Sequence, residues 1–472
     1  MDPIHRVSTY RMQGCLAYGF SLIFIEGVSE SMVLSKDSQR FRDVAAELIR
    51  FSLPLILSGV LQQLYNWADA FIVGNVEGET ALAAVGSTTS TINFYVMAIT
   101  GFTLGLSILT AQKFGSGQTA EIPRILAGFT LLLGSVFLVL AVCGILLAYP
   151  LLSLLHTTAD TIDLAGIYLR IVLAGVPFLA VYNVYSAALR GIGDSKAPFY
   201  AVLISSVTNV VLDILLVAFL RWHVAGAAIA TVFSQAAMTV FLIIYSIRKY
   251  PLLRFLPGRG SLSRSILRQG FHFGTPPMVQ SSVSSLGSLI LQNFMNGFGT
   301  QTVAAITTAY RIDSIVLLPI INLGSGISTL VAQNYGAGKH SHTRRIFSVG
   351  TVVMVVVSLL LTLLVIPTGG RLIALFGAGA EAVQIGTRFF WRIASFYVVY
   401  GLAMAVRGYL EGLGDVTYSS AAGIIALLFR ICLSYGLVAF FDNMVIAYAE
   451  AFSWALLLLL YLIRAVWRAK SR

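Results

Sequence analysis

The chain alternates between long apolar stretches and short polar segments along most of its length. A helix needs about 20 apolar residues to cross the roughly 30 Å hydrocarbon core of a bilayer. The pattern therefore predicts twelve membrane-spanning helices. Their approximate spans are 50–74, 82–110, 126–148, 164–189, 197–220, 225–247, 273–296, 303–332, 346–367, 384–407, 418–440 and 445–464.

Composition points the same way. Of the 472 residues, 57% are hydrophobic and only 11% are charged, and the mean hydropathy is +0.85. In soluble domains roughly a quarter of the residues are charged. We therefore expect an all-α polytopic membrane protein in contact with the lipid bilayer.

The net charge of +11 could indicate a nucleic-acid partner, but its distribution argues against one. Most of the 31 Lys and Arg residues precede the first span, follow the last, or lie in the connections from an even to an odd span. Only Arg221 and Arg371 lie in the other set of loops. By the positive-inside rule, both termini are expected in the cytoplasm, with the chain in the cell (inner) membrane. Topology explains the charge, and we expect no nucleic-acid partner.

The chain also repeats itself. Three pairs of segments match with a constant offset of 221 residues: AAV at 83–85 with AAI at 304–306, AQKFGSG at 111–117 with AQNYGAG at 332–338, and LRGIGD at 189–194 with LEGLGD at 410–415. A constant register indicates an internal duplication. Each unit holds six spans, an even number, so the repeats enter the membrane in the same direction.

We therefore predict two parallel six-helix lobes around a central cleft. The expected organisation is an N-terminal extension at 1–44, a first lobe at 45–247, a basic cytoplasmic linker at 248–271, a second lobe at 272–467 and a tail at 468–472. The extension holds a short apolar run, 14–25, that is too short to span a membrane and shows no clear signal-peptide cleavage site.

Enzyme chemistry finds little support. The repeated glycine motifs are not followed by the Gly-Lys-Ser or Gly-Lys-Thr of a phosphate loop. They are better explained as left-handed helix ends, and Asp194 and Asp415 as caps of the next helices. The six histidines all lie in or beside loops, and Cys15, Cys143 and Cys432 have no paired spacing. We expect no enzyme, no cofactor and no metal other than a transported Na⁺.

The polar residues inside the spans carry the functional hypothesis. Asp69 lies on span 1, and Asn209 and Asp213 lie one turn apart on one face of span 5. Their oxygens, with the hydroxyl of Thr231, suit a small hard cation, and two close carboxylates can instead share a proton. The alternatives are that Asp69 sits in water near its helix end, or that these groups only join helices by hydrogen bonds.

The second lobe lacks this constellation. The positions 221 residues after Asp69, Asn209 and Asp213 are Ile290, Arg430 and Ser434. The second lobe instead carries a set of other charges within its spans: Arg311, Asp313, Arg388, Arg392, Arg430 and Glu450. We expect Asp313 and Glu450 to neutralise the arginines as structural or gating pairs.

The order of these motifs resembles one transporter family over about residues 45–467. Pro54 with LQQLYN at 61–66 and Asp69, the twice-occurring Ala-Gln-x-x-Gly-x-Gly, and the paired Gly-x-Gly-Asp turns are similar to the multidrug and toxic compound extrusion (MATE) family. The resemblance implies alternating access and export of amphipathic or cationic compounds coupled to inward Na⁺ or H⁺. It also implies that Asp69, Asn209, Asp213 and Thr231 coordinate the cation, with Tyr65 and Gln62 lining the same lobe. The family's other acidic site, on spans 7 and 10, is missing here.

The resulting hypothesis is an antiporter that functions as a monomer, exports small-molecule drugs or toxic metabolites, and moves H⁺ or Na⁺ inward. Pro54 and Gly59 would let span 1 bend. Further expected cleft residues are aromatic or apolar: Tyr182, Tyr185, Phe273, Met278, Tyr397 and Tyr400. The alternatives are a lipid-linked oligosaccharide flippase and a non-transporting membrane receptor or scaffold.

Overall fold

The computed structural model describes residues 35–155, 157–255, 258 and 260–470, and all regular secondary structure in them is helical. The first half contains α2 (Ser35–Glu77), α3 (Glu79–Gly115), α4 (Ile122–Leu146), α5 (Ala148–Leu154), α6 (Ala159–Gly191), α7 (Lys196–Asp213) and α8 (His223–Lys249). The second contains α9 (Arg264–Asn296), α10 (Thr300–Val316), α11 (Leu318–Gly336), α12 (His340–Leu375), α13 (Ala380–Ile393), α14 (Tyr397–Gly412), α15 (Val416–Gly436), α16 (Val438–Phe441) and α17 (Val445–Lys470).

These helices form the twelve spans expected from the sequence. Eleven stretches of the described chain are long and apolar enough to cross a membrane, and α9 falls short of that hydropathy. Its sequence carries Gln280 and five serines between positions 281 and 288, which suits a helix that packs between two lobes. Residues 1–34 of the expected extension lie outside the described part, and residues 35–44 belong to α2.

Two of the spans are interrupted. Span 8 divides at Leu317 into α10 and α11, where Pro319 lacks the N–H that a continuous helix would need. Span 10 divides at the 3₁₀ turn Ala394–Phe396 into α13 and α14. Apolar patterning alone predicted each of these spans as one helix.

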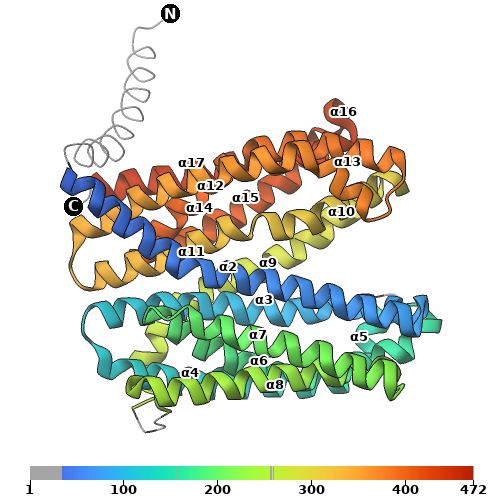
Figure 1. Ribbon diagram of the computed structural model, residues 1–472, viewed down its shortest axis with the longest axis horizontal. Coiled ribbons are helices and arrows are strands. Elements are labelled where there is room, and N and C mark those ends of the chain that lie inside the picture. Colours follow the sequence, from blue (N-terminus) through green and yellow to red (C-terminus); the bar gives the residue numbers. More distant parts are fainter. Residues whose placement is uncertain (1–34, 156, 256–257, 259, 471–472) are drawn as a thin grey trace, which may run out of the picture.

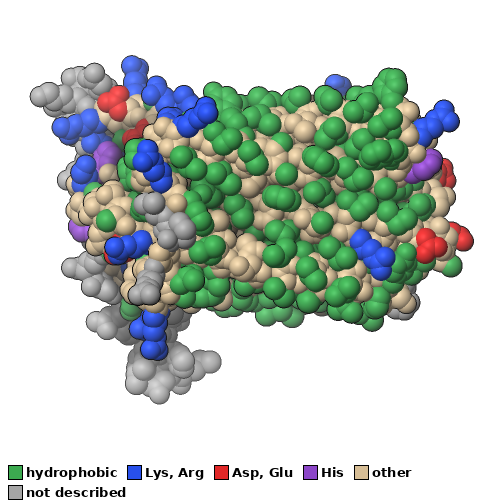
Figure 2. Space-filling model, turned by 90° about the horizontal axis from the view of Figure 1, so that it is seen from below, with side chains coloured by type: hydrophobic (Ala, Val, Ile, Leu, Met, Phe, Trp, Pro, Cys, Tyr) green, Lys and Arg blue, Asp and Glu red, His purple; other side chains and the backbone are tan. Residues whose placement is uncertain are grey.

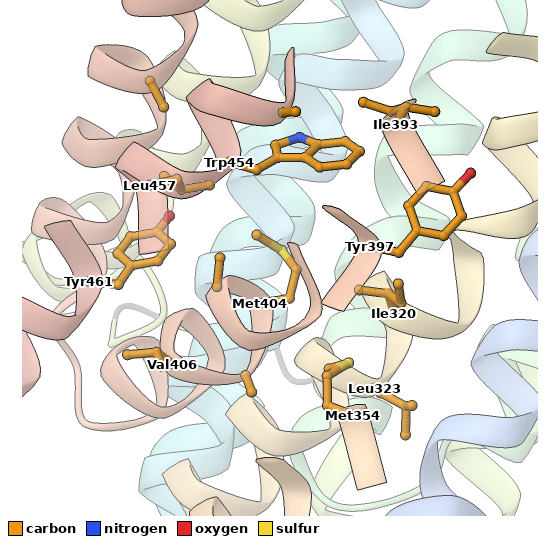
Figure 3. Close-up of a cluster of buried hydrophobic side chains, with 14 of the residues drawn as sticks. Ile320, Leu323, Met354, Ile393, Tyr397, Met404, Val406, Trp454, Leu457 and Tyr461 are labelled. Carbon is orange, nitrogen blue, oxygen red and sulfur yellow. The ribbon is translucent and has the colours of Figure 1, made fainter. Parts of the chain in front are cut away.

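The helices gather into two lobes, which lie one above the other in Figure 1. The first lobe has a core of residues from α3, α4, α6, α7 and α8, and the second has a core of residues from α10 to α17. Both cores are apolar, and Figure 3 shows part of the second, where Tyr397, Met404 and Trp454 pack together.

The first helix of each repeat passes from one lobe to the other. On α2, Val44 and Leu48 are buried in the second-lobe core, whereas Val73 is buried against α6 and α8 of the first lobe. On α9, Ile266 is buried in the first-lobe core and Met295 in the second. The two halves of the duplication are therefore interlocked.

The two ends of the bundle differ in charge. We call one the basic end: it is formed by the helix ends at Lys113, Lys196, Lys249, Lys339 and Lys470. Figure 2 shows Lys and Arg side chains gathered there, beyond a hydrophobic belt that covers the middle of the molecule. The chain end at α17 lies at the basic end in Figure 1.

Candidate functional site

The candidate site lies inside the first lobe, where α2, α6, α7 and α8 meet. Asp69 is partly buried and lies near the end of α2 that is opposite the basic end. Its Oδ1 atom has no hydrogen-bond partner among the described residues. Tyr65 lies one turn earlier on the same helix and interacts with the Asp69 carboxyl. Phe71, two residues after Asp69, is 69% exposed, so only one side of this part of α2 faces inward.

Helix α7 contributes the second carboxyl group. Asn209 and Asp213 are both fully buried, one turn apart on the same face. Asp213 is the last residue of α7, and the π-helical segment Ile214–Phe219 follows it directly. Such segments are frequent at functional sites because they re-aim side chains within a span. The Asp213 carboxyl and the Asn209 amide make no hydrogen bond to the described residues.

These groups converge across helices. The carboxyl groups of Asp69 and Asp213 interact with each other. Tyr168 of α6 lies beside both carboxyl groups and beside Thr231 of α8. The Thr231 hydroxyl donates to the Ala227 carbonyl over 3.0 Å, which leaves its lone pairs available as acceptors. The structure therefore brings Asp69, Asn209, Asp213 and Thr231 to one place.

The chemistry of this cluster follows from its charges. Two carboxylates in a low-dielectric interior repel, so they are stable together only when one holds a proton or a cation lies between them. The available donors are carboxylate, amide, hydroxyl and phenol oxygens, which suit a hard cation such as Na⁺ rather than a soft transition metal. The described residues hold no group of three or more His, Cys, Asp or Glu that could bind a metal ion.

Sequence reasoning missed Tyr168. Its only signal is a tyrosine in the apolar run of span 4, and most such tyrosines simply pack. Arg170, two residues later, is exposed and lies over the ring of Tyr149 at 4.6 Å. It points away from the site, so the polar residues of span 4 divide between two faces.

The expected cleft residues have different environments. Tyr182 and Tyr185 are buried in the first-lobe core, and Tyr397 is fully buried in the second-lobe core. In this conformation neighbouring apolar side chains cover them. Gln62 is exposed, and four others are partly buried: Tyr65, Phe273, Met278 and Tyr400. Their assignment to a substrate cleft stays a prediction.

The second-lobe charges divide into two groups. Arg430 donates to Glu450 over 2.9 Å and to the Tyr310 hydroxyl over 2.8 Å, so the expected neutralisation of Glu450 is confirmed. The expectation for Asp313 is wrong. Its carboxylate accepts a hydrogen bond from Tyr397 and forms no ion pair within the described chain.

Two further second-lobe arginines make other contacts. Arg392 donates to the Tyr448 hydroxyl over 3.2 Å and to the Arg388 carbonyl over 2.8 Å. Arg388 lies one turn before Arg392 on α13. Arg392 is thus held by neutral acceptors rather than by Asp313.

Comparison with known proteins identifies the family. The MatE family model matches residues 54–215 and again residues 276–436. The chain belongs to the MATE family. The two matched segments are the two halves of the internal repeat, and the family consists of transporters, so this protein is a multi-pass membrane transporter and not an enzyme.

Its relatives cover nearly the whole chain. The probable multidrug resistance protein YoeA of Bacillus subtilis (strain 168) is 28% identical over 466 residues, which cover 95% of this chain and 99% of that protein. The probable multidrug resistance protein YpnP of the same strain is 30% identical over 378 residues, 79% of this chain and 83% of that protein.

Solved structures share the fold. A crystal structure of MATE in the bent conformation has a TM-score of 0.84 at 20% identity and covers 93% of this chain and all of that one. A second structure, described as an outward-facing MATE transporter of the MOP superfamily, has a TM-score of 0.81 at 20% identity and covers 91% of this chain and 97% of that one.

Proposed function

We propose that this MATE transporter is a secondary active antiporter that exports amphipathic or cationic compounds in exchange for inward H⁺ or Na⁺. One observation carries the proposal: Asp69 and Asp213 form a carboxyl pair inside a membrane-spanning lobe, with no cationic side chain bonded to either among the described residues. Charged groups at that depth are costly and mark ion paths. The names of the relatives, multidrug resistance and export proteins, support the substrate class.

In the proposed orientation the protein lies in the inner membrane of the cell and its basic end faces the cytoplasm. Inward movement of one positive charge through 100 mV supplies about 2.3 kcal/mol, and an ion gradient adds to it. Cations therefore enter the first-lobe site from the opposite, outer end. They leave at the basic end once the lobes have re-oriented.

Helix α2 offers a physical link between ion binding and the other lobe. It carries Asp69 in the first lobe, and the Gln63 side chain donates to Ser314 of α10 over 3.2 Å. A Cβ on Gly59 would lie 2.9 Å from the Leu318 side chain of α11, so the leucine packs directly against α2 at that point. Pro54 removes one backbone hydrogen bond from α2 and weakens it against bending. Neutralising Asp69 would thus alter a helix that both lobes contact.

The flippase alternative predicts a cleft lined with free cationic groups. Two partly buried arginines of the second lobe are not free in the part of the chain described. Arg430 is paired with Glu450 and Arg407 with Glu411, at 2.9 Å and 2.7 Å. The paired arginines favour a drug antiporter over the export of an anionic lipid-linked substrate.

The test uses a fluorescent cationic dye and purified protein in vesicles, under a Na⁺ gradient alone and then a pH gradient alone. We expect dye transport with one of the gradients, and a loss of about tenfold or more in Asp69→Asn and Asp213→Asn, because one elementary charge is removed from the coupling pair. Asp160→Asn is the matched control, since Asp160 is exposed in the first turn of α6. Unchanged transport in both site variants would overturn the coupling role. Dye binding without gradient-driven movement would favour the receptor alternative.

A further inference from the structure

The repeated sequence motifs meet at the basic end and bond the two lobes together. Gln112, near the end of α3, donates its side-chain amide to the carbonyl of Gly412 at the end of α14 over 2.9 Å. Gln333, at the same place on α11, donates to the carbonyl of Gly191 at the end of α6 over 2.7 Å. Each glutamine belongs to one lobe and each acceptor to the other. The four residues are two pairs with the 221-residue offset of the repeat.

The helix ends approach each other at backbone distance. A Cβ on Gly115 would lie 1.8 Å from the Gln333 carbonyl oxygen, and a Cβ on Gly336 would lie 2.3 Å from that of Gln112. No larger residue fits either position without separating α3 from α11. The glycines of the Ala-Gln-x-x-Gly motif therefore allow the two lobes to touch.

The other repeated motif presents the acceptors. Gly191 and Gly412 are the last residues of their helices, where backbone carbonyl groups have no partner within the helix. Gly193 and Gly414, with φ of 97° and 90°, then turn the chain in a conformation that other residues rarely adopt. Each Gly-x-Gly-Asp turn thus ends a helix with a free carbonyl facing the other lobe's glutamine.

The aspartates of the same motif fix the first turn within its own lobe. Asp194 accepts hydrogen bonds from Tyr250 and Lys249 over 2.7 and 3.0 Å, and from the N–H groups of Lys196 and Ala197, so its expected capping role is confirmed. Burial would raise the pKa of the Asp194 carboxyl, but these hydrogen bonds outweigh it and hold the pKa below its usual value.

Asp415 holds the second turn differently. It forms no cap bond, contrary to expectation, because Arg464 and Arg468 of α17 take its oxygens, at 2.6 and 3.2 Å. Each turn is therefore anchored within its own repeat: the first to the end of α8 and Tyr250, and the second to α17. The glutamine bonds, in contrast, cross between the lobes.

An apolar layer backs the glutamines. Ile108 and Ala111 of α3 are buried against Ala332 of α11 and Val416 of α15, with Phe273 of α9 packed on them. This cluster contains residues of both lobes, and it lies beside the glutamine bonds. Together they close the basic end between the lobes.

We propose that Gln112 and Gln333 are the positioning residues of a gate at the basic end, and that both interlobe bonds break together each time the transporter opens there. The inference rests on the alternating access and orientation of the proposed function. Neutral hydrogen bonds suit this role, because each contributes little net stability in exchange for water and so can break in every cycle. Both bonds join the same two lobes, so one separation of the lobes at this end breaks both.

The test measures the gate without substrate or ion gradient. Spin labels are attached through Ser116→Cys and Ala337→Cys, both exposed at the facing ends of α3 and α11, after Cys15, Cys143 and Cys432 are replaced by Ser. Pulsed electron resonance in lipid nanodiscs then gives the distance between the labels. We expect one main short distance in the parent, and in Gln112→Ala/Gln333→Ala a longer population that raises the open-to-closed ratio by about tenfold.

Gln118→Ala is the matched control, because Gln118 lies in the same turn as Ser116 and its side chain accepts a hydrogen bond from Lys113 of its own lobe, over 2.7 Å. Its distance distribution should equal that of the parent. An unchanged distribution in the double glutamine variant overturns the gate. Gln112→Glu/Gln333→Glu adds a second readout: ionised glutamates cannot donate, so the gate should open at neutral pH and close again where the acids are protonated.

A cross-link covers the case in which the double variant does not fold. A reducible bifunctional reagent joins Ser116→Cys to Ala337→Cys in the protein without its native cysteines and with both glutamines intact. We expect dye export to stop and to return on reduction, and export that continues at the parental rate overturns the gate. Failure of the proposed function looks different: dye is not moved in the unlinked parent, while the distance measurement still reports whether the glutamines hold the lobes.

Discussion

At the scale of single residues, the two lobes treat buried charge in different ways. In the first lobe Asp69 and Asp213 face each other and are bonded to no cation of the described chain. In the second lobe Glu450 is bonded to Arg430. An unpaired carboxyl is free to take up and release a proton or an ion, whereas a paired one is held by its partner. This difference is the reason for placing ion coupling in the first lobe.

The second lobe allows a direct test of which carboxyl groups are paired. Glu450→Gln leaves Arg430 without a counter-charge in a partly buried position, and we expect a loss of about 3 kcal/mol. Asp313→Asn keeps an acceptor for the Tyr397 hydroxyl and separates no ion pair, so its melting temperature should stay close to that of the parent. Thermal unfolding of both variants in one detergent measures the difference. If Asp313→Asn is as destabilised as Glu450→Gln, Asp313 has an ionic partner.

The first-lobe carboxylates could be found from sequence because a charge inside an apolar run is conspicuous. Asn209 and Asp213 could be paired because a four-residue spacing gives one helix face. Tyr168 and the partner of Asp313 could not be found, since the sequence shows neither which tyrosines pack nor which helices meet. The expectation that Asp313 binds arginine failed for the second reason: charge balance predicts a partner, and only packing selects one.

At the scale of elements, close backbone contact between α3 and α9 joins the lobes. A Cβ on Gly105 would lie 1.9 Å from the Phe273 carbonyl oxygen, and one on Gly101 would lie 2.7 Å from that of Pro277. Helix α9 crosses from the first-lobe core to the second, so this contact holds a helix that both lobes share. Lipid-embedded helices commonly use small residues in this way to bring backbones together.

Two glycines of α3 therefore respond differently to the same substitution. Gly105→Ala forces α3 away from α9, and we expect a loss of about 1–3 kcal/mol or more from overpacking. Gly86 is the matched control on the same helix, because a Cβ there meets no atom within 4 Å. Gly86→Ala should be neutral or stabilise by up to about 1 kcal/mol through helix propensity. The measurement is the melting temperature of each variant relative to the parent. An equal change in both variants would contradict the close contact between α3 and α9.

Helix positions were predictable because hydrophobic length sets them, but interruptions were not. The breaks at Leu317 and at Ala394–Phe396 lie inside apolar runs, so no polar loop segment marks them. Pro319 gave a local signal in span 8, whereas span 10 has no proline at its break. The crossing of α2 and α9 between lobes was also hidden, since it depends on contacts between distant segments.

At the scale of the whole molecule, the 221-residue offset predicted a symmetric pair of lobes, and the matched family segments repeat that division. The sequence could show that two motifs occur twice. It could not show that each copy bonds the other copy, because an offset carries no information about contacts. The glycine ends were correctly expected to be left-handed: Gly117 and Gly338 have φ of 74° and 72°. Their contact across the lobes appears only in three dimensions.

The charge asymmetry of the bundle predicts its orientation in the membrane. Basic loops are retained on the cytoplasmic side during insertion, because moving several Lys and Arg residues across the bilayer is costly. Reporter cysteines at Gln118→Cys, at the basic end, and at Asp160→Cys, at the opposite end, test this in a background without the native cysteines; both positions are exposed.

We expect a membrane-impermeant maleimide to label Asp160→Cys in intact cells, and Gln118→Cys only after the membrane is permeabilised. The cysteine-free parent controls for labelling of other groups. Labelling in the reverse order would place the basic end outside. The end of the bundle nearest the first-lobe site would then face the cytoplasm, whereas the proposed export cycle needs that end to face the exterior. The labelling result therefore tests the direction of transport as well as the topology.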